Sequence, residues 1–253
     1  IIMPPNNLAK TSLSLKNLIK TKGVGKTMSK QLKETDITIA CDRLEDPNEN
    51  INSQCTFLTA CLMLPKQEHE HTLLNTLKQK KLHPTLTQLL HHEITHPLGP
   101  IFHKILHQNP LTKEEMIQGL ENLIKTRDTD PCNAIFLEGL RLKEESPLEN
   151  STALDFFIQH RYQCEIDRPL LIDIANPYDG FTRFAPVQLF ASIIVAACGY
   201  PCILHGVNSI GPKNGLTFEQ LLKTAEKKHT YTLTDAKISL ENPNISWAYL
   251  NQH

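Results

Sequence analysis

The sequence lacks a long apolar run, an excess of charge of either sign and a Cys-x-x-Cys pair. Its longest apolar stretch, residues 189–204, is interrupted by Gly199 and Pro201 and is shorter than the roughly 20 residues that a membrane-spanning helix needs. With 26 basic and 27 acidic side chains, the net charge of -1 excludes a strong overall attraction to nucleic acid or to anionic lipid, but not a local basic patch. Residues 1–5 lack the basic and apolar regions of a signal peptide.

The cysteines give no sign of a disulfide framework or of a redox pair. There are seven, an odd number, and we expect reduced thiols in a cytoplasmic protein. A chain of 253 residues with 40% hydrophobic residues is long enough for one large domain or two modest ones, each with a buried core.

Helical patterns dominate residues 31–160, whereas residues 1–30, rich in Lys, Asn and Ser, are expected to form an extended arm. Apolar residues over 116–124 recur at the spacing of a buried helix stripe, and Thr112 with Glu115 forms a capping box in front of them. The predicted helices cover residues 84–94, 99–108, 112–127, 131–143 and 147–160.

The helical region contains an internal similarity at a shift of 79 positions, which places Leu32 on Leu111 without any gap. The same shift places Phe57 and Leu58 on Phe136 and Leu137. We interpret this as a duplication, with a first helical repeat and its connecting helices over 31–108 and a second helical domain over 109–165. The alternative is a coincidence between two amphipathic helix pairs.

The period changes after Arg168. Leu170–Ile174 and Pro201–Leu204 are short apolar runs typical of buried strands, and a helix over Val187–Cys198 lies between them. This order predicts a βαβ unit with parallel strands. A helix from Thr217 and a strand over 245–250 follow. The predicted fold class is therefore α/β, with an amino-terminal all-helical, duplicated region followed by a partial parallel-sheet domain over 166–253.

One motif suggests a metal. Residues 92–96 read H-E-x-x-H, the zinc-binding pattern of metalloproteases, in which both histidines lie on one helix face. Pro97 follows at once, and the third ligand of that protease class is replaced by Phe102, with His103 one place away. A zinc metalloprotease is therefore a remote alternative, and we expect no bound metal here.

The two loops that follow the predicted strands of the βαβ unit form the most informative part of the sequence. The carboxyl ends of parallel strands and the amino ends of the next helices are where α/β proteins bind anionic ligands. Both loops leave the same sheet edge, so their polar residues are expected to converge; the alternative is that they cap the sheet and bind nothing. The candidate ligand-binding residues are Asn176, Asp179, Gly180, Thr182, Arg183, His205, Gly206, Asn208 and Lys213.

Three segments resemble one known family. Residues 136–147 are similar to the signature F-L-x-A-L-R-x-K-G-E-T-P, residues 196–201 to A-A-x-G-x-P, and residues 204–206 to K-H-G. These signatures are those of anthranilate phosphoribosyltransferase and its relatives, which include pyrimidine-nucleoside phosphorylases. The resemblance covers residues 111–253.

This resemblance carries several implications. The fold would pair a helical domain with an α/β domain, and substrates would bind between them. The activity would be Mg²⁺-assisted transfer of a phosphoribosyl group from phosphoribosyl pyrophosphate to the amine of anthranilate, in tryptophan biosynthesis. The protein would be a cytoplasmic homodimer.

The differences from the family fall on the phosphate ligands. Residues 175–180 replace the family's G-T-G-G-D-G loop, and Pro177 has no N–H to offer a diphosphate. Residues 186–189 replace its N-x-S-T, and Leu204 replaces the lysine of K-H-G. The sequence therefore favours weak donor binding and leaves two hypotheses: a transferase with an altered donor or acceptor, or a non-catalytic binding or regulatory paralogue, with nucleic acid as a conceivable partner. No catalytic residue is assigned.

Overall fold

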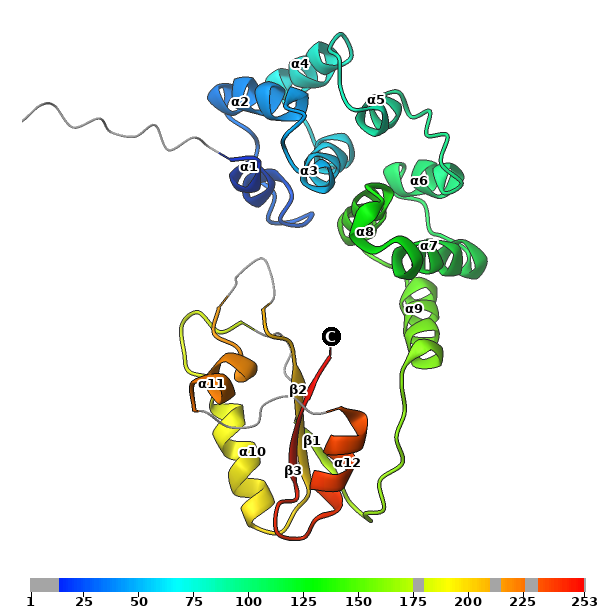
Figure 1. Ribbon diagram of the computed structural model, residues 1–253. Helices are drawn as coiled ribbons and strands as arrows, with labels where there is room; N and C mark the ends of the chain where they lie inside the picture. Colours follow the sequence, from blue (N-terminus) through cyan, green and yellow to red (C-terminus); the bar gives the residue numbers. More distant parts are fainter. Residues whose placement is uncertain (1–13, 175–179, 210–214, 226–231, 253) are drawn as a thin grey trace, which may run out of the picture. The chain divides into compact units, whose positions relative to one another are not determined.

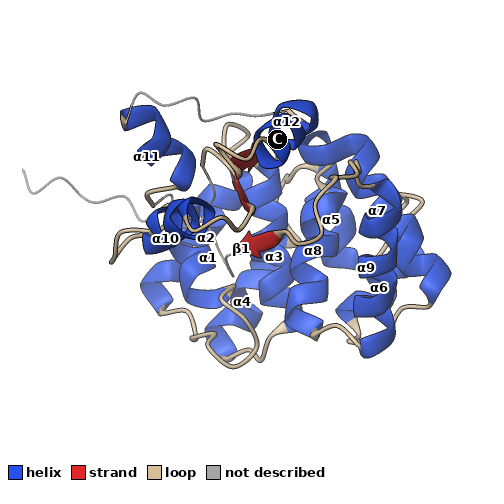
Figure 2. Cartoon of the chain, turned by 90° about the horizontal axis from the view of Figure 1, so that it is seen from below, coloured by secondary structure: helices blue, strands red, loops and turns tan. Residues whose placement is uncertain are grey.

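The computed structural model describes residues 14–174, 180–209, 215–225 and 232–252. The chain divides into two compact units between His160 and Arg161, a few residues before the expected boundary. The amino-terminal unit is helical and the carboxy-terminal unit is α/β, as the sequence predicts (Figure 1). Helices make up most of the chain and strands a small part of it (Figure 2).

The amino-terminal unit contains nine α-helices among its described residues. They are α1 (Leu15–Lys22), α2 (Glu34–Glu45), α3 (Ile51–Met63), α4 (Glu68–Leu77), α5 (Pro84–His91), α6 (Gly99–Leu106), α7 (Lys113–Thr126), α8 (Cys132–Lys143) and α9 (Pro147–His160), with a 3-10 turn, η1 (Arg127–Thr129), after α7. The expected extended arm is wrong over α1, because Leu15 and Leu18 are fully buried and α1 packs on α3. The sequence analysis overlooked this short apolar stripe because the surrounding residues are rich in Lys and Asn.

The helices of the two predicted repeats correspond in order and register. Shifted by 79 positions, α2, α3 and α4 fall on α7, α8 and α9. The packing corresponds too, since α2 packs on α4 and α7 on α9, while the equivalent helices α3 and α8 pack on each other. The helix starts also match: the Lys33 N–H donates to Asp36 at 2.9 Å, and the Thr112 N–H donates to Glu115 at 2.9 Å.

A buried glutamate fixes the start of each repeat. In the first repeat, Glu70 accepts hydrogen bonds from the backbone N–H groups of Leu32 and Gln67, at 3.2 and 2.8 Å. The Lys22 ammonium lies 2.8 Å from the Glu70 carboxylate, and both side chains are 1% exposed. The pair therefore ties α1 to α4.

The second repeat contains the same arrangement around Glu149, 79 positions after its counterpart. Glu149 accepts from the N–H groups of Leu111 and Ser146, at 2.8 and 2.6 Å. Its cation is Lys143, at 2.7 Å, which comes from the end of α8 rather than from a helix that precedes the repeat, as Lys22 of α1 does. The carboxylate position is thus repeated, whereas the source of the positive charge differs.

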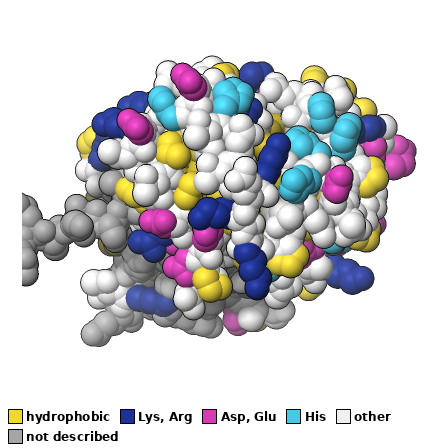
Figure 3. Space-filling model, turned by 90° about the horizontal axis from the view of Figure 1, so that it is seen from above, with side chains coloured by type: hydrophobic (Ala, Val, Ile, Leu, Met, Phe, Trp, Pro, Cys, Tyr) yellow, Lys and Arg dark blue, Asp and Glu magenta, His cyan; other side chains and the backbone are white. Residues whose placement is uncertain are grey.

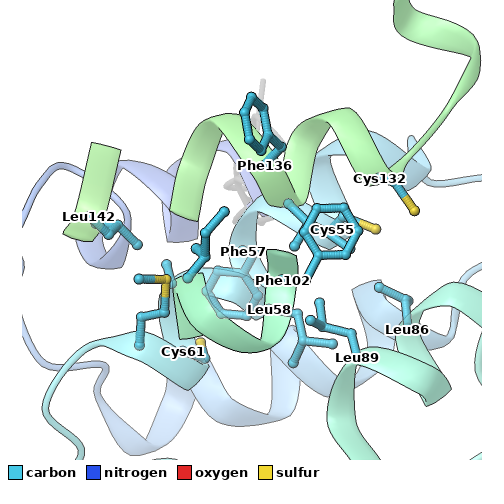
Figure 4. Close-up of a cluster of buried hydrophobic side chains, with 14 of the residues drawn as sticks. Cys55, Phe57, Leu58, Cys61, Leu86, Leu89, Phe102, Cys132, Phe136 and Leu142 are labelled. Atoms are coloured by element: carbon cyan, nitrogen blue, oxygen red, sulfur yellow. The ribbon is translucent and has the colours of Figure 1, made fainter. Parts of the chain in front are cut away.

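The core of this unit lies where α3 and α8 meet α5 and α6 (Figure 4). Phe57, Phe102 and Phe136 are fully buried there. Glycine permits the close contact of α7 with α8, since a Cβ on Gly119 would lie 2.3 Å from the Phe136 ring. Gly139 on α8 likewise leaves room for the Ile105 side chain.

The carboxy-terminal unit contains a parallel sheet with the order β1-β2-β3, formed by β1 (Ile172–Ile174), β2 (Cys202–Gly206) and β3 (Trp247–Asn251). The predicted βαβ unit is confirmed, with α10 (Val187–Ala197) between β1 and β2. Two helices, α11 (Phe218–Thr224) and α12 (Leu233–Glu241), connect β2 to β3, and the sequence reading missed α12.

Apolar residues cover both faces of the sheet. Leu204 and Tyr249 pack with Leu189 and Phe218 of α10 and α11 on one face. On the other face, Ala248 packs with Ala236 and Leu240 of α12. Side chains alternate between the two faces along a strand. The residues in these two cores therefore show on which face of the sheet each neighbouring polar residue lies.

Among the described residues, no helix is both long enough and apolar enough to cross a membrane. The seven cysteines, all within the described part of the chain, are free thiols.

Candidate functional site

An aspartate and a histidine from adjacent parallel strands meet at the sheet. The register pairs Asp173 of β1 with Ile203 of β2, so Asp173 and His205, two positions further along, lie on the same face. The His205 Nε2 atom lies 3.0 Å from the Asp173 Oδ1 atom. The histidine side chain is 26% exposed and the aspartate 55%, so water and ligands can reach both.

The loops that follow β1 and β2 are joined by their backbones. Phe181 and Leu216 form an antiparallel bridge, with N–H to carbonyl distances of 2.8 and 2.9 Å. Gly180, buried, has a φ of 85°, a conformation that glycine adopts without strain. A Cβ on Gly215 would lie 2.6 Å from the Gly180 carbonyl, so the two loops could not approach this closely with another residue there.

Asn208 anchors the second loop to α11. Its carbonyl accepts from the Thr217 hydroxyl at 3.1 Å and from the Gln220 amide at 3.0 Å. Its side-chain oxygen accepts from the Lys223 ammonium at 3.0 Å. The side-chain oxygen of Asn208 is therefore already engaged by Lys223.

The other predicted residues divide into two groups. Thr182 and Arg183 are exposed in the first loop, and Gly206 is buried, with its carbonyl accepting from the Gln252 N–H at 2.9 Å. The remaining candidates lie outside the described residues: Asn176, Asp179 and Lys213.

Two charged residues of this site were not among the candidates. Asp173 lies inside a strand, and only the pairing with β2 shows that it meets His205. Lys223 follows Glu219 by four positions on α11 and lies 2.7 Å from that carboxylate. The four-residue spacing in the sequence could have shown that Lys223 pairs with Glu219, whereas its contact with Asn208 in the second loop depends on the fold.

Leu204 shows what became of the lysine of the K-H-G segment. Its side chain is fully buried against Leu189 and Phe218 on the face opposite to His205. An apolar contact thus occupies the position at which the family resemblance implies a cation.

Of the described residues at this edge, Asp173 is the exposed carboxylate that could hold a Mg²⁺ ion, because Glu219 is buried and bonded to Lys223 and Asn251. Mg²⁺ is often held by one or two carboxylates together with substrate phosphates and water. Asp173 is therefore compatible with a substrate-borne Mg²⁺ ion, but a cage made by the described residues alone is not formed.

The H-E-x-x-H segment does not have the geometry of a zinc protease. His92 ends α5 with a φ of 57°, and the chain leaves the helix there. The ring centroids of His92 and His107 lie 5.9 Å apart, and those of His107 and His103 lie 4.3 Å apart. The Nε2 atom of His96 instead lies 3.2 Å from the Asp130 carboxylate. Several histidine side chains lie on the face of the molecule shown in Figure 3.

His96, Asp130 and Cys132 offer donor atoms within 4.8 Å of one another. The Leu98 N–H donates to His96 Nδ1 at 3.1 Å, so the proton of the neutral ring lies on Nε2, facing Asp130. Burial alone would raise the pKa of Asp130. Hydrogen bonds from the Asn122 amide and the Cys132 N–H outweigh this effect, so the pKa of Asp130 is lowered overall. Hydrogen bonds from the backbone N–H groups of Leu98 and Cys132 and from the Asn122 amide thus account for the arrangement of His96 and Asp130 at the start of α8.

The chain is similar to part of several proteins named anthranilate phosphoribosyltransferase. The chain is 30% identical over 112 residues to the anthranilate phosphoribosyltransferase of Hahella chejuensis, a match that covers 44% of this chain and 32% of the relative. It is 31% identical over 108 residues to the enzyme of Saccharopolyspora erythraea, covering 42% and 30%. For the Francisella philomiragia enzyme the identity is 27% over 119 residues, covering 47% and 35%.

These matches are partial: the aligned part spans about a third of the length of each relative. No family model matches the chain, and no solved structure matches it. The resemblance read from the signatures at 136–147, 196–201 and 204–206 is nonetheless confirmed as a distant relationship, because the chain is similar to anthranilate phosphoribosyltransferases from several organisms.

Proposed function

We propose that this is an anthranilate phosphoribosyltransferase-like protein that transfers a phosphoribosyl group from phosphoribosyl pyrophosphate to an aromatic amine or a related acceptor, with weakened binding of the donor. The observation that carries the proposal is the Asp173–His205 pair, 3.0 Å apart at neighbouring parallel strands, beside two bridged loops. The partial similarity to enzymes of that name supports it.

The pair suits proton transfer. A hydrogen bond to Asp173 holds the His205 ring with its proton on Nε2, which leaves Nδ1 as the basic atom. In the proposed reaction the amine nitrogen bonds to ribose C1 while the C1–O bond to the diphosphate breaks, and His205 takes the proton that the amine loses. Asp173 then stabilises the resulting imidazolium.

The donor side is weaker. Arg183 is exposed in the first loop and Lys223 faces the second, whereas Leu204 contributes no charge. A Mg²⁺ ion carried by the diphosphate would neutralise the leaving group, with Asp173 as its protein ligand. A charge-assisted hydrogen bond to phosphate is worth roughly 1.5–3 kcal/mol, so losing two or three contacts weakens binding about a hundredfold or more.

Calorimetry of the full chain with phosphoribosyl pyrophosphate and Mg²⁺ tests the donor. We expect weak binding that Arg183→Ala weakens further, and no effect of Arg161→Ala, an exposed arginine of the same unit. Micromolar affinity that Arg183→Ala abolishes would show that the phosphate site has been rebuilt and that the prediction of weakened binding is wrong.

Turnover of anthranilate with saturating donor, followed by chromatography, tests the pair. We expect His205→Ala to abolish transfer and Asp173→Asn to slow it. The buried Leu204 favours a second candidate, a non-catalytic binding or regulatory paralogue, with nucleic acid among its conceivable partners. Donor binding without turnover for several aromatic amines would support that candidate, and light scattering would show whether the protein is the homodimer that we propose.

A further inference from the structure

The amino-terminal unit contains a cavity of about 440 Å³ between α3 and α8, next to the end of α7. Leu123, Ala134 and Leu137 give it an apolar lining, and we refer to it as the α3–α8 cavity. Small-molecule sites are commonly clefts of roughly 300–1,000 Å³ with an apolar lining and a few polar groups. The size and lining of the α3–α8 cavity are those of such a site.

One lining residue is held in an unusual backbone conformation. Arg127 has a φ of 50°, which is costly for a residue with a long side chain. Asn133, 4% exposed, donates to the Arg127 carbonyl and, at 2.8 Å, to the Thr126 hydroxyl. Asn122 in turn donates to the Asn133 side-chain oxygen at 2.9 Å. A buried polar network thus fixes Arg127 at the edge of the cavity.

The cavity carries one uncompensated positive charge among its described lining residues. Arg141 donates to Glu138 at 2.7 Å and also to the Gly23 carbonyl, so its guanidinium is engaged. Burial raises the pKa of Glu138, although Arg141 opposes the shift. Arg127 is exposed and forms no ion pair with a described residue, so its guanidinium can receive an anion.

The first repeat contains a counterpart with the opposite charge. Leu44 and Gln54, the equivalents of Leu123 and Asn133, line a second cavity of about 400 Å³. The charged residues that line this counterpart are mainly acidic, namely Glu45, Asp46 and Glu49 with Lys81 and His83. The lining of the first-repeat cavity is therefore mainly acidic, whereas the described residues that line the α3–α8 cavity carry a net positive charge.

We propose that the α3–α8 cavity binds a small carboxylate with an apolar body. The guanidinium of Arg127 pairs with the carboxylate, for which its planar fork of donors is suited. Leu123, Ala134 and Leu137 contact the apolar body.

Titration of the full chain with benzoate, observed by NMR of the ligand, tests this site. We expect saturable binding that is at least about tenfold weaker in Arg127→Ala, because one charge-assisted contact is lost. Lys81→Ala, which removes a cation from the counterpart cavity, should leave benzoate binding unchanged. Equal binding by wild type and Arg127→Ala would overturn the proposal.

Two further measurements distinguish the contribution of the Arg127 charge to binding from that of the apolar lining. Benzamide, with the same shape and no charge, should bind at least about tenfold more weakly than benzoate, and inorganic phosphate should not displace benzoate at equal concentration. Ala134→Trp, which fills the cavity and keeps Arg127, should abolish binding while the circular dichroism spectrum stays that of the wild type. Benzoate binding that survives Ala134→Trp, or that phosphate competes with equally, would place the anion outside the cavity and refute the assignment.

Discussion

Glu149→Gln is the most informative test of how the second helical repeat is held together. The Glu149 carboxylate is fully buried, lies 2.7 Å from the Lys143 ammonium, and accepts the N–H groups of Leu111 and Ser146. The amide of glutamine keeps one acceptor oxygen but removes the negative charge. Lys143, 4% exposed, would then be a buried and unpaired cation.

The expected loss in the free energy of unfolding is about 3–5 kcal/mol, the usual cost of removing one partner of a buried ion pair. Glu145→Gln, an exposed neighbour, should change it by less than about 0.5 kcal/mol. The double variant Lys143→Met with Glu149→Gln should regain about half of the loss or more, since no unpaired charge remains.

Urea unfolding followed by two probes makes the measurement specific. Far-ultraviolet circular dichroism reports mainly on the helical amino-terminal unit, and the fluorescence of Trp247, the single tryptophan, reports on β3 of the other unit. We expect the dichroism transition to move to lower urea and the fluorescence transition to move less. A loss below about 1 kcal/mol would refute the reasoning, since it would mean that the charge is solvated.

Three other outcomes are expected. Gly119→Ala should destabilise the protein by about 1–3 kcal/mol despite the better helix propensity of alanine, because its Cβ meets the Phe136 ring, and Phe136→Leu should restore part of this loss in chemical denaturation. Ellman's reagent should modify Cys164 and Cys198, which are exposed, before any other thiol, and mass spectrometry of the labelled protein checks the order. Burial raises the pKa of Glu149, but Lys143 and the two N–H groups lower it more, so its pKa in the folded protein is lowered. The stability that this carboxylate contributes should be present above about pH 4.3, its pKa in the unfolded chain, and should be lost as the pH falls through the lower folded value. Melting curves measured at several pH values would show this loss.

Local chemistry explains which features could be read from the sequence. The helix starts at Thr112 and Thr217 are visible because a capping hydroxyl and an acceptor three positions later act within one turn. The βαβ unit is visible because strand and helix differ in their hydrophobic period. The repeat is visible because apolar residues such as Leu32 and Leu111, or Phe57 and Phe136, recur at one spacing along the buried faces of equivalent helices. The equivalence of Glu70 and Glu149 became clear only from their contacts in the structure. In contrast, α12 carries a weak periodic pattern, and α1 is short and lies in a Lys- and Asn-rich segment. The packing of α1 on α3 and of α12 on β3 stabilises them.

Only the tertiary structure shows which residues far apart in the chain are in contact. Nothing near Asp173 indicates that His205 will lie 3.0 Å from it, because that contact depends on strand register. The α3–α8 cavity depends in the same way on two helices of different repeats. Arg127 has no ion-pair partner among the described residues because the lining carboxylate, Glu138, already pairs with Arg141. Propensities and caps act over a few residues and are encoded there, whereas register, burial and charge compensation are properties of the packed chain.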